Sequence, residues 1–309
     1  MAGRSKAQRA SAGAAARAVS TRRSATTGQA ISYPRTRRIH FRFGEDQTYG
    51  TYFVNDDIVF SHFVAGLSAS FPPGEESFIR SVRRLADRIT DPELKKRIAG
   101  FIGQESTHGQ QHRRLNDKLI ERGYWMRWWD SPTVKDRMMR LEARIGGRNH
   151  LAMTAAAEHA TAVLAQRVLS SAELQAIPGD AEVWNLLNWH ALEELEHKSV
   201  AFDLYRAVQG SEARRIAVAL LLSALALPVS TMSLAYALWR DPVARRQPRR
   251  LLREAHALYT GPIFAGAGRE LAKYLQPGFH PDHIDTTELM RTWQRHLFGD
   301  HGALVDHLR

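Results

Sequence analysis

Apolar residues recur at helical spacing through most of this 309-residue chain, whereas the strict alternation of apolar and polar residues typical of strands is scarce. Alanine, leucine and arginine, which favour helices, are abundant. The sequence therefore predicts an all-α fold. The pattern places helices at residues 56–70, 75–89, 92–122, 149–170 and 181–208.

Turn signals set the expected ends of these helices. The run Phe71-Pro72-Pro73-Gly74 predicts a break between the first two, because proline lacks the N–H that a helix interior needs. Thr90-Asp91-Pro92-Glu93 predicts a helix start, with proline in the first turn and acidic groups near the positive helix end. We expect residues 39–60 to be an extended segment held to the helices by aromatic side chains, and residues 124–130, with three tryptophans, to be a crossover or lid.

An apolar run of 24 residues without a charge, 216–239, lies between Arg214-Arg215 and Arg240. It is long enough to cross a bilayer. A buried helix of a large bundle, a helix lining a pocket for an apolar substrate, or one bound to the bilayer surface would have the same composition. The basic residues that follow, from Arg245 to Arg253, suit a membrane-facing side.

The net charge of +11 comes mostly from residues 1–38, which hold nine Lys or Arg and no acid. Removing these nine from 43 basic residues leaves 34 against 32 acidic ones, so the rest is nearly neutral and no specific nucleic-acid binding is expected. With almost no large apolar residue, residues 1–38 are predicted to be a disordered basic tail. Its acid-free composition resembles an organellar transit peptide, but a solvated basic tail that touches membranes or nucleic acid weakly is the simpler interpretation. We expect a cytoplasmic protein with possible membrane association.

Two copies of one ligand pattern carry the chemistry, Glu105-Ser-Thr-His108 and Glu194-Leu-Glu-His197. Residues three apart lie on the same side of a helix, so each carboxylate and imidazole can bind one metal ion together. Glu158, among small residues, and either Glu75 or Glu76 lie on the other two helices. There is no cysteine, so nitrogen and oxygen must be the metal ligands.

This order of ligands, a Glu from each of two helices and a Glu-x-x-His from each of the other two, is that of the ferritin-like di-metal four-helix bundle. The chain also resembles a bacterial family named predicted metal-dependent hydrolases over about residues 36–295. The resemblance is carried by Phe71-Pro72-Pro73-Gly74-Glu75, Phe101-Ile102-Gly103-Gln104-Glu105 with His108 and His112, Glu158-His159, Trp189–Lys198 with Ala201-Phe202-Asp203, and Pro277–Pro281. It implies a metal site, and it selects Glu75 rather than Glu76 as the first-helix ligand.

We therefore expect residues 39–210 to form the di-metal bundle and residues 211–309 a C-terminal helical extension. One ion would be held by Glu75 and His108 and the other by Glu158 and His197, with Glu105 and Glu194 bridging. Carboxylate and imidazole ligands suit iron, which we expect, as well as manganese or zinc. His112 and His190, one turn from ligands, are candidates for additional ligands, proton carriers or residues that orient ligands.

Each of these residues has a simpler interpretation, because a single Glu or His on a helix is most often solvated. Glu193 and Glu196 are expected to form salt bridges on other faces, with Lys198 as one partner, and His62, His159 and His280 to pack or hydrogen-bond. The ordered set of four acids with two histidines favours the metal site. Three functions fit it: di-iron oxidation or oxygenation of an apolar small molecule, which we expect first; two-metal hydrolysis; and metal storage or a structural bundle.

Overall fold

The computed structural model describes residues 34–44 and 50–309, and the regular structure in these residues is helical. The α-helices are α2 (Ile58–Ala86), α3 (Pro92–Glu121), α4 (Pro132–Ile145), α5 (Gly147–Ser170), α6 (Ala172–Gln175), α7 (Ala181–His197), α8 (Val200–Ala207), α9 (Glu212–Arg240), α10 (Pro248–Thr260), α11 (Ala267–Ala272) and α12 (Thr287–Phe298). Short 3₁₀ turns cover Ala244–Arg246, Lys273–Leu275, Pro281–His283 and Val305–His307. Isolated β-bridges join Ile39 to Leu308 and Val54 to Gly179. The predicted all-α fold is confirmed.

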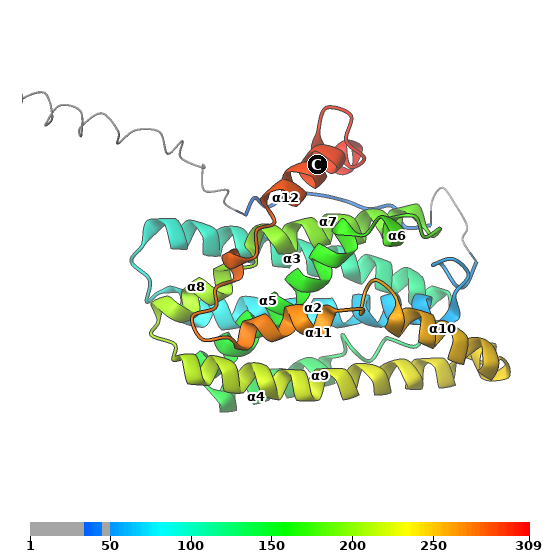
Figure 1. Ribbon diagram of the computed structural model, residues 1–309, viewed down its shortest axis with the longest axis horizontal. Coiled ribbons are helices and arrows are strands. Elements are labelled where there is room, and N and C mark those ends of the chain that lie inside the picture. Colours follow the sequence, from blue (N-terminus) through cyan, green and yellow to red (C-terminus); the bar gives the residue numbers. More distant parts are fainter. Residues whose placement is uncertain (1–33, 45–49) are drawn as a thin grey trace, which may run out of the picture. The chain divides into compact units, whose positions relative to one another are not determined.

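Four helices form the centre of the fold: α2 packs against α3, α5 packs against α7, and each pair contacts the other (Figure 1). Asp57, Asp91 and Asp180 cap α2, α3 and α7, because each accepts a hydrogen bond from a first-turn N–H. The buried apolar residues separate into clusters toward the two ends of this bundle. Between the clusters lies a layer of buried polar residues that includes the predicted ligands.

The predicted helix break at residues 71–74 is wrong, because α2 runs through Pro72 and Pro73 without interruption. Pro72 cannot donate to the carbonyl of Ser68, four residues earlier. The side-chain amide of Asn116 on α3 donates to that carbonyl instead, at 3.1 Å. Gly109 allows the close approach of α3, since a Cβ there would lie 3.7 Å from Pro72 Cα and 3.1 Å from Glu75 Oε2. The neighbouring helix therefore replaces the hydrogen bond that Pro72 removes from α2.

Two other parts of the chain differ from the predicted elements. The helix expected over 181–208 is divided into α7 and α8 at Lys198 and Ser199. Residues 132–145, for which no helix was expected, form α4, which follows the tryptophan-rich segment 124–130. Of the aromatic residues expected to hold the extended segment, Phe41, Phe43 and Phe53 are buried; Tyr52 donates to Asp241 at 2.8 Å, and Tyr49 lies outside the described residues.

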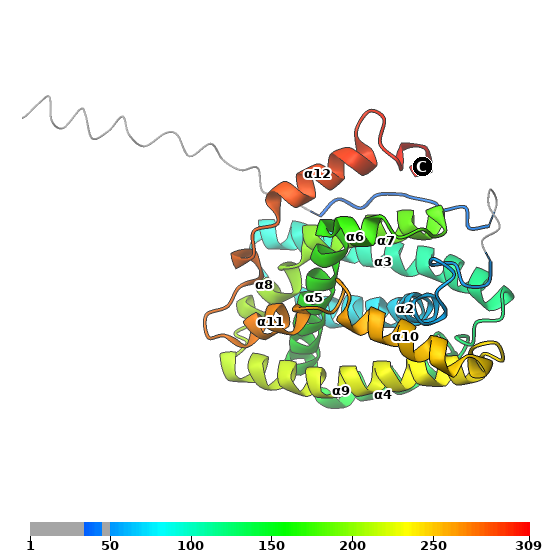
Figure 2. The ribbon, with the colours of Figure 1, turned by 45° about the vertical axis from the view of Figure 1, so that its right-hand side comes forward.

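The predicted basic tail extends too far in sequence. Residues 1–33 lie outside the described residues, but 34–38 belong to the fold, since Arg37 forms ion pairs with two acids of α7. The predicted C-terminal extension, 211–309, belongs to the same compact unit as the bundle. Its first helix, α9, contacts α5 and α2 along the side of the bundle opposite α12 and the C-terminus (Figure 2).

Helix α9 is the one described helix whose length and composition would allow it to cross a membrane. Only 6 % of its most apolar 18-residue stretch is buried. The expectation that this run could be a buried bundle helix is therefore wrong.

Candidate metal centre

The six predicted ligands converge at the centre of the four-helix core, and each is at most 5 % exposed. Helix α2 provides Glu75, α5 provides Glu158, and α3 and α7 each provide a Glu-x-x-His pair. Glu76, the alternative to Glu75, instead lies half-buried at the surface and pairs with Arg113. Among the described residues, three overlapping groups have ligand atoms within 4.8 Å of one another: Glu75 with His108 and His190, Glu105 with Glu158 and His197, and Glu105 with His108 and Glu194.

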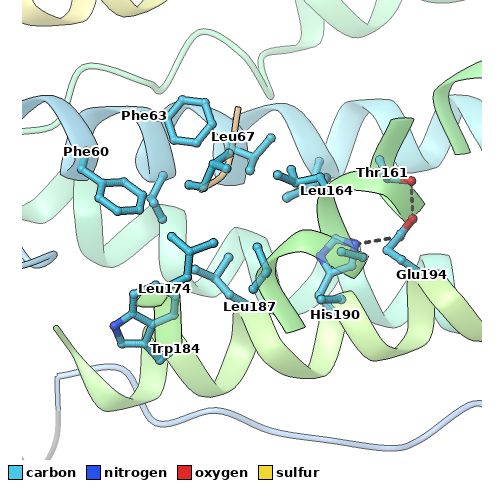
Figure 3. A pocket seen from close by; sticks show the side chains of 16 residues that line it. Phe60, Phe63, Leu67, Thr161, Leu164, Leu174, Trp184, Leu187, His190 and Glu194 are labelled. Atoms are coloured by element: carbon cyan, nitrogen blue, oxygen red, sulfur yellow. Dashed lines mark hydrogen bonds and ion pairs between the residues drawn. The ribbon is translucent and has the colours of Figure 1, made fainter. Parts of the chain in front are cut away.

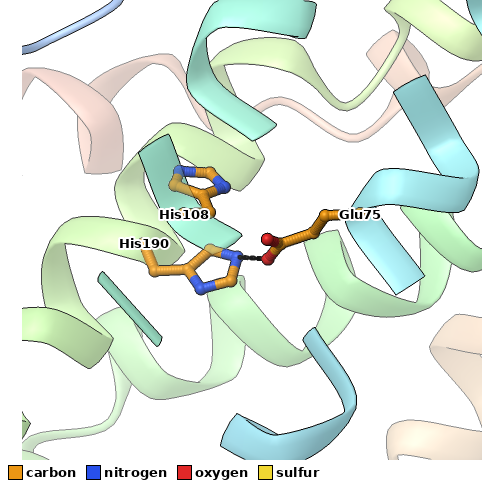
Figure 4. A group of neighbouring side chains, drawn as sticks. All are labelled: Glu75, His108 and His190. Atoms are coloured by element: carbon orange, nitrogen blue, oxygen red, sulfur yellow. Dashed lines mark ion pairs between the residues drawn. The ribbon is translucent and has the colours of Figure 1, made fainter. Parts of the chain in front are cut away.

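The first group combines ligands from three helices, as Figure 4 shows. His190 Nε2 lies 3.7 Å from Glu75 Oε1 and 2.9 Å from Glu194 Oε1. His108 Nδ1 lies 3.8 Å from Glu194 Oε1 and 4.0 Å from Glu105 Oε2. One ion could therefore be held by Glu75, His108 and His190, with Glu105 and Glu194 beside it.

The second group surrounds His197. Its Nε2 atom lies 3.2 Å from Glu105 Oε1, 3.3 Å from Glu158 Oε2 and 3.5 Å from Glu194 Oε1. Glu105 thus takes part in groups with both histidines, and Glu194 approaches both of them. Glu105 and Glu194 therefore lie between the two histidines, and their bridging of two ions stays a prediction.

Most of these ligand atoms have no hydrogen-bond partner among the described residues. Both carboxylate oxygens of Glu75, Glu105 and Glu158 are buried without a hydrogen bond, as are His108 Nδ1 and His197 Nε2, although His197 Nε2 lies within ion-pair distance of Glu105 and Glu158. Leaving so many buried polar atoms unsatisfied is costly. Four carboxylates and neutral imidazoles fit two divalent cations, since the charges balance and every such atom gains a partner.

The other nitrogen of each predicted histidine ligand is held by a buried side chain. His108 Nε2 lies 3.0 Å from Glu193 Oε2, and His197 Nδ1 lies 3.0 Å from Gln104 Oε1. These contacts leave His108 Nδ1 and His197 Nε2 directed at the centre, as metal-binding histidines generally require.

A single arginine supports both of these contacts. Arg37 donates to Glu193 at 2.7 Å and to both oxygens of Glu196 at 2.6 and 2.8 Å. Glu196 in turn accepts from the side-chain amide of Gln104, at 2.9 Å. The prediction that Glu193 and Glu196 form salt bridges holds, but the partner Lys198 is wrong, because its ammonium donates to Ile284 O and Thr286 Oγ1.

Hydrogen bonds also define the roles of the two additional histidines. Ser68 Oγ donates to Asn116 Oδ1 at 2.6 Å, so it accepts from His112 Nδ1 at 2.9 Å. Burial lowers the pKa of His112 well below its usual value, which keeps the ring neutral and makes its Nε2 atom an acceptor. His190 Nδ1, 2.7 Å away, must then donate. With Nδ1 as the donor to His112, the Nε2 atom, which forms a 2.9 Å hydrogen bond with Glu194 Oε1, is the nitrogen of His190 that a metal ion beside Glu75 and Glu194 could take instead, and His112 orients the ring.

The carboxylates of the site have strongly shifted pKa values. Burial and the neighbouring carboxylates raise the pKa of Glu75 and Glu105 well above the usual value. Burial raises the pKa of Glu158 to about 7. Burial also acts on Glu194, but the attraction of His197 and the hydrogen bond to His190 outweigh it and hold the pKa of Glu194 well below its usual value. The site therefore holds protons that divalent ions would displace.

A narrow apolar cavity of about 60 Å³ reaches this centre. Figure 3 shows Phe60 and Trp184 at one end of it and Thr161, His190 and Glu194 at the other. Phe63, Leu67 and Leu164 line the space between these ends. Thr161 Oγ1 donates to Glu194, which fixes that carboxylate at the boundary between the cavity and the metal centre.

The remaining histidines that the sequence analysis set aside have hydrogen-bond partners elsewhere. His62 Nε2 lies 3.0 Å from Asp241, His159 Nε2 lies 3.2 Å from Glu270 O, and His280 Nε2 lies 2.8 Å from Asp203. The sequence analysis did not single out Gln104, Arg37 or Thr161 for a role at the site. Gln104 directly precedes the predicted ligand Glu105, and this position is the one feature of the sequence that could have indicated its role.

Arg37→Met is expected to lower the free energy of unfolding by about 3 kcal/mol, because it leaves two buried carboxylates without their cation. Glu193 and Glu196 have side chains only 0 % and 4 % exposed, so water cannot replace the guanidinium. Chemical denaturation measures the change. Arg38→Met, at the exposed neighbouring position, is the matched control. Equal stability of the two variants would contradict the proposed support.

The family described as predicted metal-dependent hydrolase matches residues 35–285, and the chain belongs to this family. No curated protein and no solved structure matches the chain. Membership supports metal dependence, in agreement with the buried His and Glu groups of the core. It also favours hydrolysis over the oxidation that the ligand pattern suggested first.

Proposed function

We propose that the protein is a hydrolase that uses two divalent metal ions and acts on a substrate with an apolar chain. The observation that carries the proposal is the set of converging, buried Glu and His atoms without hydrogen bonds at the polar end of an apolar cavity. The family description supports the hydrolytic class. The ions would be held by Glu75, Glu105, His108, Glu158, Glu194 and His197, with His190 as a further ligand.

When bound, such a pair of ions supplies a polarised scissile group and an activated water molecule. The side chains that line the cavity would position the substrate and exclude bulk water from the ions. Leu67 and Leu164 would hold the apolar part of the substrate, so that its polar group lies at Glu194 and His190. Thr161 keeps the Glu194 carboxylate in place through its hydrogen bond.

A panel of p-nitrophenyl esters of acetic, octanoic and dodecanoic acid tests this function. Under strict anaerobiosis, the manganese- or zinc-loaded protein should hydrolyse the long-chain esters with a higher kcat/KM than the acetate. Chelation should abolish the hydrolysis, and fresh metal should restore it. Failure to hydrolyse any of these esters with any of the metals would contradict the proposal.

Oxidation of an apolar molecule by a di-iron form is the second candidate. It is favoured by the ligand set of four Glu and two Glu-x-x-His histidines, which matches the ferritin-like di-metal arrangement. Dioxygen uptake by the iron-loaded protein, without anaerobic ester hydrolysis, would favour this candidate. Accumulation of iron beyond two atoms per chain, without turnover, would instead indicate storage.

Leu164→Trp is expected to raise the KM for p-nitrophenyl octanoate at least about tenfold, because a larger side chain fills the narrow cavity. Its metal content should stay that of the unchanged protein, which separates a blocked cavity from a damaged fold. The matched control is Val305→Trp, at a 39 % exposed position near the C-terminus. If KM does not rise in Leu164→Trp, the substrate does not occupy this cavity.

A further inference from the structure

Helix α9 exposes a long apolar surface. Eight large side chains along it are between 41 % and 72 % exposed: Leu220, Leu221, Leu225, Leu227, Val229, Met232, Tyr236 and Trp239. The charge-free run of 24 residues is about 36 Å long as a helix. Soluble monomers rarely expose a continuous apolar surface of this size, so a partner for it is expected.

The edges of this surface carry groups suited to a lipid headgroup region. Trp125 and Trp128 are 37 % and 40 % exposed, and the Trp125 ring lies 4.7 Å from that of Tyr236 on α9. The Arg240 guanidinium lies 6.0 Å from the Trp125 ring. Exposed arginines continue beyond the helix, at Arg245, Arg246, Arg249 and Arg253. Aromatic rings and cations beside an apolar helix are typical of proteins that bind anionic membranes.

Both ends of α9 are fixed to the rest of the fold, so the helix would lie along a membrane rather than cross it. At its start, Arg215 is fully buried and donates to Tyr274 O and Gln276 O. At its end, Asp241 accepts from Tyr52 at 2.8 Å and lies 3.0 Å from His62 Nε2. Crossing a bilayer would require breaking these contacts and separating α9 from α2 and α5.

A hollow of about 740 Å³ lies between α9 and α2, beside the tryptophan-rich segment. Met232 and Tyr236 of α9, Trp128, and Phe63 and Leu67 of α2 line it. Phe63 and Leu67 also line the narrow cavity that reaches Glu194 and His190. These two side chains therefore separate the hollow at the α9 surface from the cavity at the metal centre.

We propose that the exposed face of α9, with Trp125 and Trp128, binds the surface of an anionic lipid bilayer, and that the substrate is a membrane lipid whose acyl chain enters between α9 and α2. The choice of substrate rests on the proposed hydrolase function, whereas membrane binding does not. A second copy of the chain is the other possible occupant. The arginines and tryptophans at the edges favour lipid, because like-charged arginines of two copies would be brought together.

Co-sedimentation of the full chain with vesicles of phosphatidylcholine and phosphatidylglycerol tests the membrane contact. The protein should bind these vesicles, and it should bind less to phosphatidylcholine alone or at high salt, because the arginines recognise anionic lipid. The double variant Leu221→Glu/Leu225→Glu should bind at least about 100-fold more weakly, since two apolar side chains no longer enter the bilayer. Both positions are exposed, so the fold should be retained.

The matched control is Val305→Glu/Leu308→Glu, which adds the same charge at exposed positions near the C-terminus. It should bind vesicles like the unchanged protein. Equal vesicle binding by both double variants would overturn the proposal. So would a dimer in solution that only Leu221→Glu/Leu225→Glu dissociates, together with no vesicle binding, since a second copy would then cover α9.

Two further measurements separate this proposal from the hydrolase function. Glu105→Ala should still bind vesicles, because it changes only the metal centre. Leu221→Glu/Leu225→Glu, at exposed positions that do not line the hollow, should still hydrolyse soluble p-nitrophenyl octanoate but should lose hydrolysis of phosphatidylglycerol in vesicles. Vesicle binding without hydrolysis of any substrate would overturn the hydrolase function and the lipid-substrate part alone.

Discussion

Glu105→Ala is expected to abolish binding of the metal pair. Glu105 belongs to two of the three ligand groups and approaches both His108 and His197, so its loss removes a ligand from both proposed ions. We expect metal affinity to fall by more than the roughly 100-fold that even a supporting residue can cost. Glu194→Ala should have a similar effect, because that carboxylate also lies near both histidines.

Metal analysis after loading and desalting measures this effect. The unchanged protein should retain two ions per chain and the two variants should not. Glu121→Ala, on the same helix as Glu105 but with a side chain 64 % exposed, is the matched control and should retain the pair. Equal metal retention in Glu105→Ala and Glu121→Ala would contradict the assigned site.

Metal affinity is expected to fall steeply as the pH decreases from about 8 to about 6. Burial raises the pKa of Glu158 to about 7, and burial with the neighbouring carboxylates raises those of Glu75 and Glu105 well above the usual value. These groups bind protons as the pH falls through their pKa values, and a metal ion must displace those protons. Each displaced proton lowers the affinity about tenfold per pH unit, so a fall of at least about 100-fold is expected over this range.

The pKa values of two other predicted ligands, His197 and Glu194, are shifted in opposite directions. The pKa of His197 is raised well above its usual value, because the attraction of Glu194 and Glu158 exceeds the effect of burial, so this imidazolium also loses a proton when metal binds. The pKa of Glu194 is lowered, so that carboxylate is already ionised over this range. Calorimetry in two buffers of different ionisation enthalpy measures the protons released. Proton-free binding with constant affinity would contradict this account.

The buried Glu and His residues of the candidate centre could be predicted to lie together because their spacing in the sequence is local. Glu105 with His108 and Glu194 with His197 need only helical periodicity to share a face, and the order of the acids indicated four helices. The choice of Glu75 over Glu76 needed the family resemblance. The structure places Glu75 in the core and Glu76 near Arg113 at the surface.

The features that local sequence could not reveal depend on contacts between distant residues. Asn116 on α3 satisfies the carbonyl that Pro72 leaves free, and nothing near Pro72 in sequence indicates this. Arg37 lies in a segment rich in arginine, so its sequence neighbours give no sign of its role. In the fold it pairs with acids more than 150 positions away. The exposure of α9 was also undetermined, because a buried helix and a membrane-binding helix have the same apolar composition.

The most direct test of the central claim is anomalous diffraction from crystals of the metal-loaded protein. The account predicts two anomalous peaks about 3.5–4 Å apart, enclosed by Glu75, Glu105, His108, Glu158, Glu194 and His197. It also predicts that His190 Nε2 is close to one of them. Crystals of fully loaded protein in which the peaks lie elsewhere, with these six side chains hydrogen-bonded only to each other or to water, would contradict it.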